Sequence, residues 1–275
     1  MVFTNTPGVA GLPKNFDGVP VIVKVTGEIK ALPKPPSSPG KDKPGEDPVD
    51  PIDPTSRFDR PVPIGVSTGH PAITAGTIGA RVTDGSDVYA LSNNLVYADE
   101  NMSSIGDTVI QPGTYDGGAT PADAIGTLFD YEPINFSGAD NLIDAAIALS
   151  SADNLGKATP SDGYGIPQSN AVVARVNLKV KKYGRTTGFT KGKVFAIKAT
   201  VNVGYDSSVA RFVNQIVITP GTFSAGGDSG SLIVSDDRKS RNQPVGLLFA
   251  GSNTITIANP IDVVLERFGV TIDGN

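Results

Sequence analysis

Short runs of apolar and β-branched residues, separated by turn residues, dominate the chain after residue 60. Two runs, at 75–82 and 88–92, flank the segment TDGSD at 83–87 and predict a β-hairpin. Strands this short, with turns at close intervals, favour a sandwich or a barrel. The remaining runs cover residues 141–149, 171–180, 193–203, 212–218, 231–234, 245–249 and 254–258.

Three other segments have their own patterns. Near the C-terminus, Asn259 and Pro260 suit a helix start and Gly269 suits its end. Residues 1–31 contain one predicted strand at 19–25 but are too few for a core. We therefore expect this small N-terminal β segment to pack on another unit or to mediate self-association. Residues 32–60 alternate proline with charged residues, which is typical of an extended linker, and show no ordered metal-binding motif.

Composition narrows the classes of function. The 275 residues include 32 glycines and 22 prolines, no cysteine, and a net charge of −5. The weakly acidic balance gives no reason to expect nucleic acid as a partner, and no apolar run is long enough to cross a membrane. The first residues lack the pattern of a signal peptide, which leaves the location open and favours a cytoplasmic one.

The strongest chemical signal is Gly226-Gly227-Asp228-Ser229-Gly230. A serine nucleophile needs a tight turn that glycine permits, and the N–H groups of Gly227 and Ser229 can then converge on an oxyanion. This motif resembles the nucleophile turn of the chymotrypsin/trypsin superfamily of serine peptidases.

Other motifs occur in the order of that superfamily. The apolar run around Asp144 resembles the strand of the catalytic aspartate, and YGRTTG at 183–188 resembles a segment of secreted bacterial members. The run at 245–251, with Phe249, Ala250 and Gly251, resembles the strand that pairs with the substrate backbone. The resemblance covers residues 61–275. It implies an all-β fold of two six-stranded antiparallel β-barrels, at about 61–150 and 165–275, with a C-terminal helix.

Leucine stands where this superfamily has its catalytic histidine. The order of motifs places that histidine at Leu95, with Asp144 and Ser229 following at the usual spacing. Leucine accepts no proton, so Ser229 lacks a general base at this position. One replacement in an otherwise complete motif set favours a deliberately inactivated variant over a natural pseudoprotease.

Two further residues bear on the site. His70 is the sole histidine, but it lies a full hairpin upstream of the expected position, so we predict a packing role for it. By resemblance, Phe223 lies at the base of the primary specificity pocket, and Phe249, Ala250 and Gly251 form its wall. An apolar pocket of this kind does not favour a basic side chain.

The sequence therefore predicts a serine endopeptidase, inactivated at Leu95, that takes peptide or protein substrates without a cofactor or metal. Two alternatives stay open. One is a natural pseudoprotease acting as a binding or scaffold protein. The other is a hydrolase that acts on esters, because the same machinery cleaves them.

Overall fold

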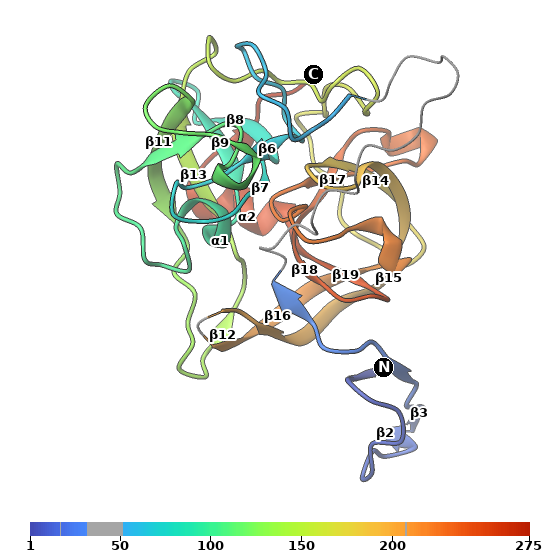
Figure 1. Cartoon of the computed structure of the whole chain (residues 1–275). Helices are drawn as coiled ribbons and strands as arrows, with labels where there is room; N and C mark the ends of the chain where they lie inside the picture. Colours follow the sequence, from blue (N-terminus) through green and yellow to red (C-terminus); the bar gives the residue numbers. More distant parts are fainter. Residues whose placement is uncertain (17, 32–51, 207) are drawn as a thin grey trace, which may run out of the picture.

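A computed structural model describes residues 1–16, 18–31, 52–206 and 208–275 (Figure 1). Most of the predicted linker, residues 32–51, lies outside the described residues. The strands are β1 Val2–Thr4, β2 Asn15–Phe16, β3 Val19–Pro20, β4 Val23–Val25, β5 Lys30–Ala31, β6 Ser67–Thr68, β7 Gly76–Thr77, β8 Ala80–Thr83, β9 Val88–Ser92, β10 Thr108–Ile110, β11 Ala124–Tyr131, β12 Asp140–Asn141, β13 Ala146–Ser150, β14 Lys179–Gly184, β15 Gly188–Gly204, β16 Val209–Thr219, β17 Leu232–Ser235, β18 Pro244–Gly251, β19 Thr256–Pro260 and β20 Thr271–Ile272. The α-helices are α1 Asn94–Tyr97 and α2 Ile261–Phe268.

Six strands form the first sheet, in the order β10-β11-β13-β9-β8-β20. The predicted hairpin is present, with Thr83 opposite Val88 across the β8–β9 turn. The run predicted at 141–149 is interrupted: Asn141 ends β12, β13 begins at Ala146, and Asp144 lies in the segment between them. The C-terminal strand β20 pairs with β8, although it follows the second sheet in the chain.

The second sheet contains the longest strands. Its antiparallel pairings run β14–β15–β16–β19–β18–β17 and return to β14, and β5 and β12 are attached to this set. The pairings of the first sheet follow an open order. The all-β class with a C-terminal helix is thus confirmed, whereas closure of both sheets into six-stranded barrels stays a prediction.

The N-terminal segment forms small pairs of its own. The run predicted as one strand at 19–25 is two strands, of which β3 pairs with β2 and β4 pairs with β1. Figure 1 shows β2 and β3 lying away from the sheets, with β5 against the second sheet. Phe3 of β1 packs against a core cluster of the second sheet, and Lys24 of β4 lies over the Phe195 ring. Among the described residues of this segment, only β5 pairs with a strand of the main body.

The helix α2 helps to join the two sheets. It begins after Pro260 and ends at Gly269, whose left-handed φ of 63° suits glycine. Asn259 does not cap this helix, because its side chain is used elsewhere. One core cluster contains α2 residues Ile261 and Val264 together with Leu91 of the first sheet and Leu247 of the second. The sheets therefore share part of their buried apolar surface.

Candidate active site

The three residues expected to form a catalytic triad come from three separate elements. Leu95 lies in α1 directly after β9, Asp144 precedes β13, and Ser229 precedes β17. The Leu95 backbone N–H donates to Asp144 Oδ1 at 3.3 Å. The Ser229 hydroxyl donates to the Phe249 carbonyl at 3.2 Å, and Phe249 belongs to the same core cluster as Leu95. The structure thus brings the three positions to one region.

Asp144 is fully buried, and its environment changes its acidity. Burial raises the pKa of this carboxyl to about 6, against the lowering effect of hydrogen bonds from Tyr205 and from the backbone of Leu95 and Asn94. The backbone is fixed as well, since Asn93 Nδ2 donates to the Asp144 carbonyl and the Asp144 N–H donates to Asn259 Oδ1. The carboxylate is therefore held firmly at the end of the first sheet.

Tyr205 is a site residue that the sequence reasoning missed. It lies in the turn between β15 and β16, and its hydroxyl donates to Asp144 Oδ2 at 2.8 Å. Burial, and then the nearby Asp144 charge, raises the pKa of this phenol well above its usual value. The ring packs against Phe136 and Phe212. No local pattern marks a lone tyrosine in a hairpin turn, so only the tertiary contact identifies it.

The turn around Ser229 depends on glycine. Gly227 has a φ of 93° and Gly230 a φ of 94°, in the region that side chains rarely adopt. A Cβ on Gly230 would also lie 2.2 Å from Ser92 Oγ and from the Thr77 carbonyl. The motif is therefore needed both for its backbone shape and for close approach to the first sheet.

Hydrogen bonds orient the peptide groups of this turn. Thr186 Oγ1 donates to the Gly226 carbonyl at 2.6 Å, and Ser231 Oγ donates to the Asp228 carbonyl at 2.6 Å. In a planar trans peptide the N–H points opposite to the carbonyl. The N–H groups of Gly227 and Ser229 therefore point away from Thr186 and Ser231 respectively.

The buried side chain of Asp228 holds the turn around Ser229 in place. Its carboxylate accepts bonds from the N–H groups of Thr186 and Thr187 and pairs with Lys182 Nζ at 3.3 Å. Both charged side chains are fully buried. Burial lowers the pKa of Lys182, and the Asp228 charge opposes that shift. Thr186 and Thr187 of the YGRTTG segment thus hold the turn around Ser229 through Asp228.

The strand expected to pair with substrate is already paired. Ala250 and Gly251 of β18 lie opposite Ala31 and Lys30 of β5, in antiparallel register. A groove of about 750 Å³ runs beside this edge. It is lined by Thr26, Gly27, Glu28, Lys30, Gly221, Thr222, Ser224, Ala225, Gly226, Gly251, Ser252 and Asn253.

Phe223 is placed differently from the expectation. Its ring is fully buried in the core of the second sheet with Val180 and Val194, and it is not among the described residues that line the groove. The physical reason is that the apolar core offers the ring more contact than a solvated pocket. Gly251 does line the groove, whereas Phe249 and Ala250 are fully buried behind it.

His70 is held in another environment. Its Nε2 lies 3.3 Å from Asp107 Oδ2, and its Nδ1 accepts from the Ala72 N–H. Its backbone N–H donates to the Val96 carbonyl. Both ring nitrogens therefore have partners outside the Asp144 and Ser229 region.

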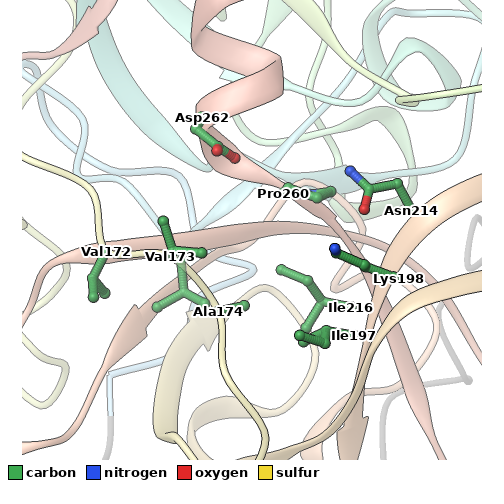
Figure 2. Close-up of a pocket in the computed structure, with 10 residues that line it drawn as sticks. Val172, Val173, Ala174, Ile197, Lys198, Asn214, Ile216, Pro260 and Asp262 are labelled. Carbon is green, nitrogen blue, oxygen red and sulfur yellow. The ribbon is translucent and has the colours of Figure 1, made fainter.

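A separate cavity of about 200 Å³ lies elsewhere on the second sheet (Figure 2). None of the candidate site residues lines it, so it is not part of the active-site region. Its lining consists of Val172, Val173, Ala174, Ile197, Lys198, Asn214, Ile216, Val245, Pro260 and Asp262.

Two absences apply to the described part of the chain. Among residues 1–16, 18–31, 52–206 and 208–275, no cluster of histidine, aspartate and glutamate is arranged to hold a metal ion. In the same residues, no helix has both the length and the apolar character to cross a membrane.

Comparison with known proteins adds to this picture. The family model for the Nal1 C-terminal domain matches residues 148–259, which include the turn around Ser229. No curated protein matched the chain.

Solved structures match over most of the chain. Thermobifida fusca Protease A has 20% identity and a TM-score of 0.56, covering 78% of this chain and 98% of its own. A glutamic acid specific serine protease that uses a histidine triad in substrate binding has 23% identity and a TM-score of 0.57, covering 77% and 100%. Cellulomonas bogoriensis chymotrypsin has 18% identity and a TM-score of 0.52, covering 79% and 100%. The chain therefore has the fold of the trypsin-like bacterial serine proteases.

Proposed function

We propose that this chain carries a serine peptidase centre that lacks its general base. Ser229 is the nucleophile, Gly227 and Ser229 supply the oxyanion N–H groups, and β18 from Phe249 to Gly251 holds the peptide backbone. The observation that carries the proposal is the contact between the Leu95 N–H and the buried Asp144 carboxylate. It supports Leu95 as the occupant of the histidine position.

The expected chemistry follows from these roles. A substrate carbonyl would lie against Ser229, and the oriented N–H groups would stabilise the charge of a tetrahedral intermediate. The serine hydroxyl must lose its proton as it attacks, and a leucine side chain has no atom that accepts one. Loss of a triad base generally costs a factor of about 10⁴ to 10⁶ in rate, so we expect very weak hydrolysis.

A second candidate is a binding or scaffold protein, and one contact favours it. Asp144 Oδ2 accepts the Tyr205 hydroxyl, and this carboxylate would have to orient an imidazole in an active enzyme. Leu95 itself is 3% exposed within an apolar cluster. Leu95 offers no general base, and the Tyr205 hydroxyl already binds the Asp144 carboxylate. Both features support a site that binds peptides without cleaving them.

Rescue of catalysis separates the two candidates. We expect Leu95→His with Tyr205→Phe to hydrolyse peptides through Ser229, because the aspartate is then open to an imidazole. The single Leu95→His variant should be weaker, since Tyr205 competes for Asp144. Activity should rise as pH passes through about 6 to 7, where an unperturbed histidine loses its proton. The assay is turnover of a broad fluorogenic peptide library.

Ser229→Ala in the double variant is the matched control and should abolish turnover. A serine-directed phosphonate should label Ser229 in the double variant and not in the parent chain. If the folded double variant neither turns over peptides or esters nor reacts with the phosphonate, the peptidase proposal fails. The binding or scaffold function then takes its place.

The expected substrates and the expected self-association rest on different observations. The fold favours peptide or protein substrates, and an ester substrate would use the same groups. Self-association through the N-terminal segment is supported by the exposed side chains of Ile22, Val23 and Val25. Sedimentation velocity with Val23→Ser tests that association, which should weaken in the variant.

A further inference from the structure

The strand β18 extends beyond its partner β17. Their pairing reaches Leu247 opposite Leu232. Farther along, Ala250 and Gly251 pair with β19 on one side, which leaves the side facing β17 as the free edge. The strand β5 occupies this edge, with Ala31 opposite Ala250. The N-terminal segment therefore pairs with β18 one residue away from Phe249, whose carbonyl accepts the Ser229 hydroxyl.

Side chains of β5 and its neighbour are buried at this edge. Ile29 is 8% exposed and Ala31 is 4% exposed, and both belong to the cluster that contains Leu95 and Phe249. The Gly204 N–H also donates to the Ile29 carbonyl at 3.0 Å. Backbone pairing and apolar contact thus act together, which is how an added strand binds a sheet edge.

A second anchor holds the other end of the segment. The Thr26 carbonyl accepts from Ser252 Oγ at 2.6 Å and from Thr254 Oγ1 at 3.0 Å. Thr26, Gly27, Glu28 and Lys30 also line the groove beside Gly226. Residues 26–31 therefore form one wall of the space that a peptide paired with β18 would use.

We propose that residues 26–31 are an internal competitor that occupies the β18 edge of the same chain. This rests on the proposed function only in taking that edge as the peptide-binding edge. An external peptide must displace β5 before it can pair with Ala250 and Gly251. The partner that fits is an extended peptide with an aliphatic side chain in place of Ile29 and a small one in place of Ala31.

The contact is small enough to be reversible. Two residues of β5 pair with β18, and two apolar side chains are buried with them. Covalent attachment supplies an effective concentration on the order of millimolar, which a free peptide must overcome. Point substitutions in the segment should therefore open the edge without altering the sheets.

The test measures peptide binding to the full chain. A fluorescein-labelled peptide of sequence Thr-Gly-Glu-Ile-Lys-Ala is titrated with the parent chain, Ile29→Asp and Lys30→Pro, and its anisotropy is followed. Ile29→Asp places a charge among apolar side chains, and Lys30→Pro removes a backbone N–H from β5. Both variants should bind the peptide at least about tenfold more tightly than the parent, because the competitor has left the edge.

Val9→Asp is the matched control, since Val9 is 45% exposed in the same N-terminal segment. It should bind like the parent chain. Equal affinity in all four proteins, or no binding in any, would overturn the proposal. Conversion of a dimer to a monomer by Ile29→Asp in sedimentation would also overturn it, since the strand would then come from a second copy. None of these readouts needs hydrolysis, so failure of the peptidase proposal leaves their result intact.

Discussion

Asp144 is the central residue of the candidate site. It is fully buried, yet its partners are a tyrosine hydroxyl and backbone N–H groups rather than a histidine. An ionised carboxylate in such surroundings is costly, and the high pKa of about 6 reflects that cost. The Tyr205 hydroxyl takes the place of the polar side-chain contact that an imidazole would supply. The site can therefore be stable without being catalytic.

The raised pKa of Asp144 predicts a pH-dependent stability. Its folded pKa of about 6 exceeds the ordinary value of 3.8, so the folded state holds the proton more tightly. The stabilisation is full below pH 3.8 and is lost as pH rises through about 6. Between about pH 4 and 7, the free energy of unfolding should fall by roughly 2–3 kcal/mol relative to Asp144→Asn. Urea denaturation of both proteins measures this difference, and parallel pH profiles would contradict it.

The hairpin of β15 and β16 is the element that connects the site to the second sheet. Its turn carries Tyr205, and its strands are kinked where Lys198 and Asn214 adopt positive φ values of 53° and 64°. The pairing register shifts between Ala196 and Ala199. Asparagine tolerates this conformation, whereas lysine is strained in it. The hairpin thus belongs to the second sheet and, through Tyr205 in its turn, also contacts Asp144.

Relief of that strain should stabilise the protein. Lys198→Gly removes an exposed side chain from a left-handed position, where a Cβ costs about 1–2 kcal/mol. Glycine also stabilises the unfolded chain, so we expect a net gain of about 0.5–1 kcal/mol in the free energy of unfolding. Lys198→Ala is the control, since it keeps the Cβ and should give no gain. Thermal and urea unfolding of the three proteins check the order.

The whole molecule is joined through its C-terminus. After α2 the chain returns to the first sheet, where β20 pairs with β8. Ile272 is 1% exposed, and its core cluster includes residues of both sheets. Arg81 adds an ion pair with Asp273 at 2.7 Å. The two sheets should therefore unfold as one cooperative unit.

Truncation of one C-terminal side chain tests this cooperativity. Ile272→Ala should lower the free energy of unfolding by about 2–5 kcal/mol, because it leaves a cavity in the shared core. Native-state hydrogen exchange should show equal loss of protection in β9 of the first sheet and β16 of the second. Thr271→Ala, at the neighbouring exposed position, is the control and should change little. Loss of protection confined to the first sheet would show that the sheets unfold separately.

The sequence alone determined those features that depend on local backbone chemistry. The turn around Ser229 could be predicted because Gly227 and Gly230 must adopt positive φ values. The β8–β9 hairpin could be predicted because turn residues separate two apolar runs. The assignment of Leu95 to the histidine position, made from the spacing of the motifs, stays a prediction.

The tertiary structure alone decided the contacts between distant segments. The Tyr205–Asp144 bond joins residues 61 apart, and β5 reaches β18 from the opposite end of the chain. Phe223 was expected at a pocket but is buried in the core, and Asn259 holds the Asp144 backbone instead of capping α2. These outcomes depend on which surfaces the packed sheets present to each other. A residue type and its neighbours in sequence do not encode that geometry, because long-range packing selects one partner from many of similar chemistry.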